Sequence, residues 1–199
     1  MGIKLLYGLV VCGGQSSRMG TDKSMLVYYG MPQMYYLYDM LEKLCNKTFL
    51  SCNVAQSEEI PNDYNLIIDT PKYTNSGPMA AIFSAFEKYP EANFLVVGCD
   101  YPFIKSEHLA YLIDSFSGDA LAASYYNEKE KVREPLLAIY RSECYAEILM
   151  LFEKGDYSLN HFLKDIDAQK IIPSSPEIII SIDTKEEYEE TLKILEQRH

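Results

Sequence analysis

The sequence has no block of basic residues. Its 18 Lys and Arg residues stand against 29 Asp and Glu residues, which gives a formal net charge of −11 at pH 7. A protein that follows a nucleic-acid backbone needs a basic surface to neutralise the phosphates. The charge balance therefore argues against nucleic acid as a partner. An anionic ligand would have to be held by local Arg, Lys or amide groups, or by a divalent metal.

Long apolar runs are also missing. No run approaches the roughly 20 residues that a membrane-spanning helix needs, and the first residues lack the three regions of a signal peptide. The five cysteines include no C-x-x-C pair, so their spacing fits neither a zinc site nor a disulfide framework. We therefore expect a cytoplasmic protein with buried, reduced thiols and no membrane partner.

Histidine is scarce, and nothing in the sequence divides the chain. The three His residues form no cluster, which gives little support to a His-based metal site or catalytic triad. The chain has no long Gly/Ser linker, low-complexity tract or internal repeat. With 199 residues and 48% hydrophobic content it can bury one substantial core. We expect a single domain over residues 1–199.

Apolar runs alternate with segments of helical periodicity along the chain. Strands are predicted over residues 5–12, 48–54, 66–68, 94–99, 120–124, 135–140, 171–172 and 178–182, with a polar loop over 125–131. Helices are predicted after Pro32, from Gly77-Pro78 to Phe86, from Ser106 to Phe116, from Ser142 to Phe152, from Ser158 and from Thr184, with Ser106, Ser142 and Thr184 as caps. This alternation predicts an α/β fold with three α/β/α layers and a mostly parallel central sheet.

Glycine or polar residues follow four of the predicted strands. Gly13 comes after the first strand, Asn53 ends the second, and Asp69 and Asp100 follow the next two. Open α/β sheets bind ligands beyond the carboxyl ends of their strands. We therefore expect these four positions to converge on one site.

The stretch from Leu9 to Lys23 predicts phosphate binding. Gly13 and Gly14 let the backbone approach a ligand closely, and the fork of Arg18 and the point charge of Lys23 suit phosphate oxygens. The spacing matches neither the P-loop nor the Rossmann fingerprint. A plain turn after the strand is the competing interpretation.

Four blocks of the sequence carry a family resemblance. They are Val11-Cys12-Gly13-Gly14 with Arg18-Met19-Gly20-Thr21-Asp22-Lys23, Gly77-Pro78-Met79-Ala80, Cys99-Asp100-Tyr101-Pro102-Phe103, and Glu134-Pro135-Leu136-Leu137-Ala138-Ile139-Tyr140. In these blocks the chain resembles the molybdenum cofactor guanylyltransferases and related nucleotidyltransferases over nearly its full length. The resemblance implies a Rossmann-like nucleotidyltransferase fold.

The resemblance also implies an activity. GMP would pass from GTP to the phosphate of molybdopterin, usually already carrying molybdenum, with release of pyrophosphate; Mg²⁺ would be the cofactor and molybdoenzyme maturation proteins further partners. A cytidylyltransferase or a sugar-phosphate nucleotidyltransferase is a related alternative. A nucleotide-binding protein without catalysis is an alternative from a different class.

Residue roles follow from the matched positions. The expected catalytic residues are Arg18, Lys23 and Asp100, with Asp100 as the metal ligand; the expected nucleotide-binding residues are Val11, Cys12, Gly13, Gly14, Arg18, Lys23, Asn53, Asp69 and Gly77. Glu134 and Asp183 are candidates for binding the acceptor. An ion pair with Arg133 is an equal alternative for Glu134. For Asp183 the alternatives are a second metal ligand or favourable charge at the start of the last helix.

Three parts of the sequence depart from the family pattern. Cys12 replaces the usual Ala, and Ala81 stands where many members have Gly, which would strain the backbone if that position needed positive φ. The closing Asn-x-Asn-Thr-Pro-Glu motif reads Ser181-Ile182-Asp183-Thr184-Lys185-Glu186. The loss of both asparagines bears on how the acceptor is recognised and leaves its identity open.

Overall fold

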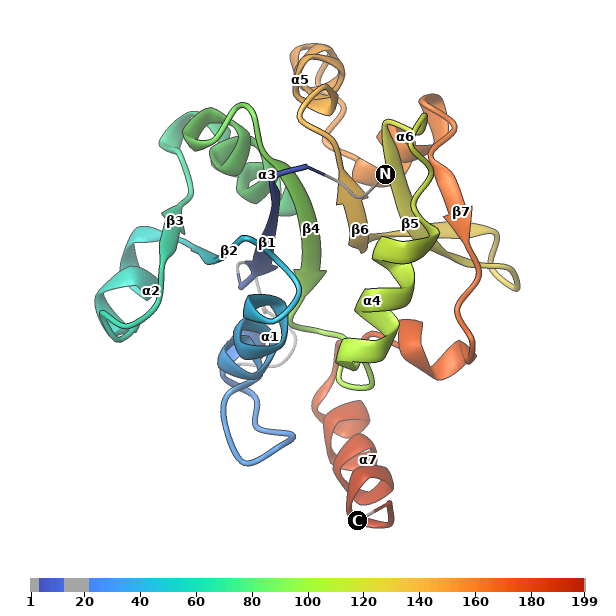
Figure 1. Cartoon of the computed structure of the whole chain (residues 1–199). Helices are drawn as coiled ribbons and strands as arrows, with labels where there is room; N and C mark the ends of the chain where they lie inside the picture. Colours follow the sequence, from blue (N-terminus) through green and yellow to red (C-terminus); the bar gives the residue numbers. More distant parts are fainter. Residues whose placement is uncertain (1–3, 13–21, 199) are drawn as a thin grey trace.

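A central sheet of seven strands organises the chain in a computed structural model that describes residues 4–12 and 22–198 (Figure 1). The strands are β1 (Leu6–Val11), β2 (Lys47–Cys52), β3 (Leu66–Ile68), β4 (Asn93–Gly98), β5 (Ala122–Asn127), β6 (Val132–Tyr140) and β7 (Gln169–Ile171), in the order β3-β2-β1-β4-β6-β5-β7. Neighbouring strands in the described residues are parallel except where β6 pairs with β4 and β5. The predicted mostly parallel sheet is confirmed.

Helices cover both faces of this sheet. They are α1 (Gln33–Glu42), α2 (Val54–Glu59), α3 (Pro78–Lys88), α4 (Ser106–Ser115), α5 (Cys144–Glu153), α6 (Leu159–Asp165) and α7 (Lys185–Glu196), with short 3-10 helices η1 (Lys23–Met25), η2 (Pro71–Tyr73) and η3 (Pro176–Ile179). On one face α1 and α4 bury Leu37 and Leu109 against the sheet. On the other face α3, α5 and α6 bury Phe83, Ile148 and Phe162. The three-layer architecture is therefore also confirmed.

Strand β4 shows why the sheet forms. All six of its residues are buried. Phe94 and Val96 pack into the core under α3, whereas Leu95 and Val97 pack into the core under α1 and α4. A strand covered on both faces reads as a continuous apolar run, because alternate side chains enter different cores. Because β4 is buried on both faces, the position of its end, and so of Asp100 two residues later, is fixed by the core.

The last helix packs beside the segment that follows Lys23. Leu195 of α7 belongs to a small cluster with Leu26, Tyr28 and Phe103. The hydroxyl of Tyr188 donates to the backbone oxygen of Val27 at 3.1 Å. Thr184 and Glu187 form the predicted capping box at the start of α7. Among the described residues, no helix is long and apolar enough to cross a membrane.

Several predicted elements differ from the structure. The strand predicted over 178–182 is wrong, since Ile178 and Ile179 lie in η3. The strand predicted to end at Asn53 stops at Cys52, and Asn53 instead caps α2, a helix that was not predicted. β5 runs into the expected polar loop as far as Asn127, and β6 begins at Val132, directly after that loop, rather than at Pro135. The caps assigned to Ser106 and Ser142 are also wrong, because helices α4 and α5 begin after Lys105 and Glu143.

The strand register places the predicted site residues at one edge. Val11 of β1 aligns with Ser51 of β2 and with Gly98 of β4, and Cys52 of β2 aligns with Ile68 of β3. Residues that follow these four parallel strands must therefore share the carboxyl edge of the sheet. Asn53, Asp69 and Asp100 do so, which confirms that they lie at one edge; that they form a single site stays a prediction. Gly13, Gly14 and Arg18 lie outside the described residues, so their roles stay predictions.

Candidate active site

A cleft of about 710 Å³ opens beside the carboxyl ends of β1, β2 and β3. Its lining includes Val11, Asn53, Asp69 and Gly77, four of the residues predicted to bind nucleotide. They come from separate segments of the chain and meet because three parallel strands end together against the start of α3. The volume lies in the range typical of small-molecule sites.

Two polar side chains on the wall of this cleft are held by neighbours. The Asp69 carboxylate accepts a hydrogen bond from the Ser51 hydroxyl at 2.9 Å. Burial raises the pKa of Asp69, and the Ser51 hydrogen bond partly offsets that rise. Asn53 accepts from the backbone N–H of Gln56 at 2.9 Å as the cap of α2. Both side chains therefore have fixed orientations before any ligand binds.

The start of α3 forms the facing wall. Gly77 has a φ of 58°, a left-handed value that favours glycine, and Pro78 occupies the first turn of the helix. The amide groups at a helix start carry partial positive charge and suit an anion. Ala81 lies inside α3 and is not among the residues with positive φ. Alanine in place of the family's glycine therefore imposes no backbone strain there.

Asp100 stands two residues beyond the end of β4. Its Oδ1 atom is buried and has no hydrogen-bond partner in the described part of the chain. Burial raises the pKa of Asp100 to about 6; the charge of Lys23 opposes this rise, and that of Asp183 adds to it. A buried, unpartnered carboxylate oxygen fits a hard divalent cation, and Mg²⁺ is often bound by one or two carboxylates plus substrate phosphates. The described residues contain no group of three or more His, Cys, Asp or Glu side chains arranged to hold a metal.

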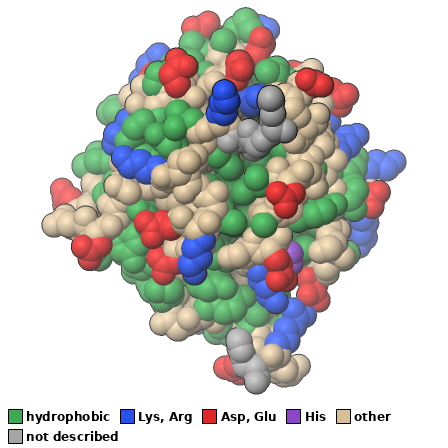
Figure 2. Space-filling model, viewed as in Figure 1, with side chains coloured by type: hydrophobic (Ala, Val, Ile, Leu, Met, Phe, Trp, Pro, Cys, Tyr) green, Lys and Arg blue, Asp and Glu red, His purple; other side chains and the backbone are tan. Residues whose placement is uncertain are grey.

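Lys23 and Asp183 form an ion pair beside Asp100. Lys23 begins η1, and the backbone N–H of Ile182 donates to the Asp100 carbonyl at 2.8 Å, which brings the segment before α7 to the end of β4. The Asp183 side chain is thus directed at Lys23, whereas Thr184 and Glu187 cap α7. On the face of the molecule shown in Figure 2, Lys and Arg side chains lie interspersed with Asp and Glu side chains.

Gly98 leaves room for the Asp100 carboxylate. A β-carbon at position 98 would lie 2.5 Å from Asp100 Oδ1 and 3.1 Å from the Leu136 β-carbon. Real β-carbon contacts are not that short, so either the carboxylate or β6 would have to move. The glycine therefore helps set the position of the proposed metal ligand.

This contact gives a testable expectation for Gly98→Ala. Overpacking at this buried position should lower the free energy of unfolding by about 1–3 kcal/mol and displace the Asp100 carboxylate. Urea unfolding measures the first effect and Mg²⁺ titration the second. Gly118→Ala is the control, because a β-carbon there meets no heavy atom within 4 Å. Equal free energies of unfolding for Gly98→Ala and Gly118→Ala would contradict the claim that Gly98 leaves room for the Asp100 carboxylate.

Glu134 also lies close enough to Asp100 for the two charges to interact. The Tyr101 hydroxyl donates to Glu134 Oε2 at 2.9 Å, and burial raises the pKa of Glu134. Arg133 turns away to Asp167, at 3.1 Å from its Oδ1, and to the Ala168 carbonyl. Successive residues of a strand point to opposite faces, and Arg133 pairs with Asp167, so the alternative of an ion pair between Arg133 and Glu134 is wrong. Acceptor binding by Glu134 stays a prediction.

Sequence reasoning missed two residues that hold the site in place. Ser51 bonds Asp69, and Gln56 bonds both Asn53 and Asp22. The spacing Asn53-x-x-Gln56 is that of a capping box, so the start of α2 could have been predicted from the sequence. Ser51 left no such signal, because its partner is set by the register of two strands.

Comparisons with known proteins agree with this arrangement. The model of the family described as "MobA-like NTP transferase domain" matches residues 8–171. A Synechocystis protein named "Molybdenum cofactor biosynthesis bifunctional protein" is 35% identical over 92% of this chain, which spans only 52% of that protein. A Nostoc protein named "Probable molybdenum cofactor guanylyltransferase" is 26% identical over 92% of this chain and 88% of its own length.

Solved structures give the same fold. Molybdopterin-guanine dinucleotide biosynthesis protein A from Archaeoglobus fulgidus superposes with a TM-score of 0.80 at 19% identity, over 96% of this chain and 99% of its own. The family match starts within β1 and runs to the end of β7, so it takes in the whole sheet and the cleft at its carboxyl edge. On that match, the chain belongs to the MobA-like NTP transferase family.

Proposed function

We propose that this chain transfers GMP from GTP to the phosphate of molybdopterin, with release of pyrophosphate. The observation that carries the proposal is that Asp100 follows β4, the strand next to β1, at the same edge of the sheet as the cleft lined by Val11, Asn53, Asp69 and Gly77, and that the charge of Lys23 acts on Asp100. The names of the Synechocystis and Nostoc relatives support molybdenum cofactor chemistry, and the Nostoc name supports guanylyl transfer.

The proposed chemistry is an in-line displacement at the α-phosphorus of GTP. A phosphate oxygen of the acceptor forms the new P–O bond while the bond to pyrophosphate breaks, so no protein nucleophile is needed. Asp100 would hold Mg²⁺, which neutralises charge on the phosphate oxygens when bound. Lys23 would exchange Asp183 for a phosphate oxygen and so place its ammonium group against the developing charge.

The nucleoside would lie in the cleft. Asn53 and Asp69 offer oxygens with fixed directions on one wall, and the start of α3 offers amide groups on the other. Glu134 and Asp183 lie near Asp100 and are not among the residues that line the cleft, so the acceptor would bind on their side of the metal ligand. Molybdopterin that already carries molybdenum is the proposed form of the acceptor.

A related enzyme with another nucleotide or acceptor is the second candidate. Ser181 and Asp183 replace the two asparagines of the family's closing motif, and Asp183 is engaged with Lys23. A carboxylate at that position would repel a negatively charged acceptor more strongly than an amide would. This observation supports a cytidylyltransferase or a sugar-phosphate nucleotidyltransferase as the second candidate.

Thermal unfolding with GTP, CTP, ATP and UTP, each with and without Mg²⁺, should separate the candidates. A ligand at 100 times its Kd stabilises the folded state by about 2.7 kcal/mol, and we expect the largest rise in Tm from GTP with Mg²⁺. Pyrophosphate release on mixing GTP, Mg²⁺ and molybdopterin should follow. A larger shift with CTP would favour the second candidate, and nucleotide binding without pyrophosphate release would argue for a non-catalytic protein.

A further inference from the structure

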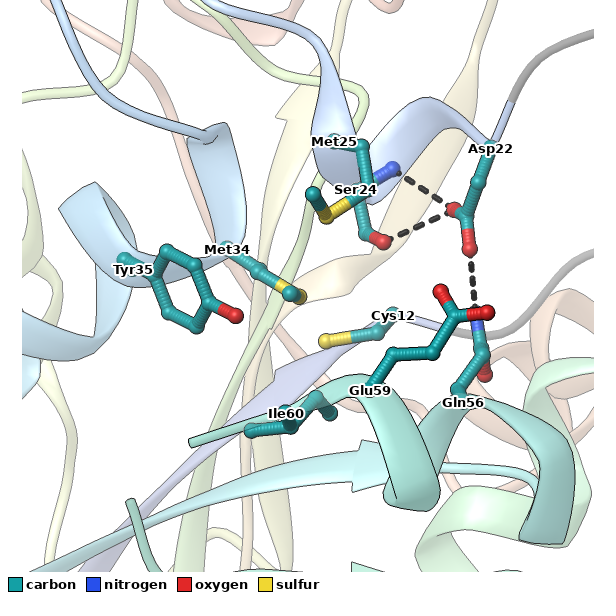
Figure 3. A pocket seen from close by; sticks show the side chains of 9 residues that line it. All are labelled: Cys12, Asp22, Ser24, Met25, Met34, Tyr35, Gln56, Glu59 and Ile60. Atoms are coloured by element: carbon teal, nitrogen blue, oxygen red, sulfur yellow. Dashed lines mark hydrogen bonds between the residues drawn. The ribbon is translucent and has the colours of Figure 1, made fainter. Parts of the chain in front are cut away.

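A chain of hydrogen bonds joins the start of α2 to the turn that carries Lys23 (Figure 3). Gln56 Nε2 donates to Asp22 Oδ2 at 2.6 Å. Asp22 Oδ1 in turn accepts from the backbone N–H of Ser24 at 2.9 Å and from its hydroxyl at 2.7 Å. Ser24 is 1% exposed, so the far end of this chain is anchored in the protein interior.

The amide of Gln56 has only one orientation that satisfies its surroundings. Its Oε1 accepts from the backbone N–H of Asn53 at 3.0 Å, and a backbone N–H can only donate. The Nε2 group must therefore face the carboxylate of Asp22, which can only accept when ionised. The donor of Gln56 is thus committed to Asp22 by the same capping box that starts α2.

Asp22 caps the short helix that begins at Lys23 and so helps to fix the backbone of Lys23. As the cap of η1 it fixes the first turn of that helix, which Lys23 opens. Gln56 ties this cap to α2, the helix that begins with the cleft residue Asn53. On the other side of the segment 13–21, the backbone N–H of Cys12 donates to the Ser51 carbonyl of β2 at 3.0 Å. The residues that flank the segment are therefore both bonded to the β2–α2 unit.

We infer that Gln56 and Asp22 are positioning residues that set Lys23 against the triphosphate by tying its turn to the wall of the nucleoside cleft. The inference rests on the proposed function for the identity of the ligand. Neither residue touches the reacting atoms in this arrangement. Their effect passes through the direction of the Lys23 side chain, and small displacements of a charged group from its productive geometry reduce rate strongly.

Two single variants and their combination test the inference. Gln56→Glu keeps the oxygen that accepts from Asn53 but turns a carboxylate oxygen toward Asp22, so it breaks the link and retains the cap. Asp22→Asn presents an NH₂ group to the Gln56 NH₂ group and breaks the same link. In the double variant the amide introduced at position 22 can donate to the carboxylate introduced at position 56, which restores the bond with the donor and acceptor exchanged.

We expect each single variant to lower kcat about 10- to 100-fold and to raise KM for GTP by up to about tenfold, because GTP would bind through the same phosphate contacts, with a Tm close to wild type. The double variant should recover most of the loss, as a double-mutant cycle reveals for residues in contact. Glu59→Gln is the matched control, because Glu59 lies on α2 and lines, together with Gln56 and Asp22, the small pocket shown in Figure 3, and is not among the residues that line the nucleoside cleft. Unchanged kcat in the single variants, or a folded double variant as impaired as the singles, would overturn the inference.

A second readout separates this inference from the proposed function. Inorganic tripolyphosphate with Mg²⁺ probes the phosphate contacts without a base or an acceptor, and its Kd can be measured by calorimetry. The single variants should weaken this binding about tenfold relative to wild type, and the double variant should restore it. If wild type failed to release pyrophosphate from GTP, the proposed function would fall, and the tripolyphosphate series would still decide the role of Gln56 and Asp22.

Discussion

Asp100→Asn should lower kcat by about 10²- to 10³-fold and at the same time stabilise the metal-free protein. The first effect follows because the buried Oδ1 atom of Asp100 would lose the charge that holds Mg²⁺. The second follows because asparagine removes a carboxylate that burial disfavours in its ionised form. Loss of activity combined with gain of stability would distinguish a metal ligand from a structural residue. Asp114→Asn, on the exposed side of α4, is the control.

The stabilising effect has a defined pH window. The pKa of Asp100 is about 6 in the folded protein against 3.8 for the ordinary side chain. A raised carboxyl pKa means that the folded state holds the proton more tightly, so this group lowers stability as pH rises from about 4 to about 6. The penalty is absent below that window and complete above it, at roughly 2–3 kcal/mol.

Urea unfolding without metal at pH 4, 5, 6 and 7.5 measures this window. The difference in unfolding free energy between Asp100→Asn and wild type should grow over the window and then level off. Added Mg²⁺ should narrow the difference at pH 7.5 by stabilising wild type alone. A difference that stayed constant with pH would show that the Asp100 carboxylate is not destabilised by burial.

Lys23→Ala should reduce kcat by about 10²- to 10³-fold while leaving the protein nearly as stable as wild type. The lysine pairs with Asp183, whose side chain is 55% exposed. Ion pairs with such exposure contribute about 0–1 kcal/mol to stability. The loss of rate, in contrast, reflects a charge aimed at the transition state.

Steady-state kinetics together with thermal unfolding check this expectation. Lys185→Ala removes an equally basic side chain from the start of α7, where it pairs with Glu189 rather than with a site residue. That control should retain wild-type kcat. A Lys23→Ala variant with wild-type kcat, or one that unfolds before it can be assayed, would contradict a mainly electrostatic role for Lys23.

The parts of the fold that the sequence predicted well are those set by burial or by local chemistry. The apolar run of β4 needs two covering layers, and Thr184 with Glu187 forms a cap from residues three apart. Helix α2 was missed because none of its residues is buried, so it has no apolar stripe. The strand predicted over 178–182 was wrong because its run of isoleucines suits a strand, whereas packing of Ile178 and Ile179 into the core selected a 3-10 turn.

In the candidate site, too, features set by local sequence were predicted and those set by tertiary packing were not. Asn53, Asp69 and Asp100 were found because strand ends can be located from composition, and parallel strands end at one edge. The ion pair of Lys23 with Asp183 joins residues 160 positions apart, and the bond of Gln56 to Asp22 spans 34. Pairings over such distances depend on tertiary packing and leave no local pattern. The contact between Gly98 and Asp100 is likewise invisible before the backbone is placed.

The packing of α7 against the segment after Lys23 joins parts of the chain that are synthesised at very different times. Lys23 emerges early, but its partner Asp183 follows 160 residues later, and Tyr188 and Leu195 later still. At 5–20 residues per second that interval lasts about 10–30 s. The residues that line the cleft lie between Val11 and Ala81, whereas the residues that support the lysine turn are synthesised more than 100 positions later. A nascent chain would thus contain every segment that lines the cleft well before Lys23 gains its partner.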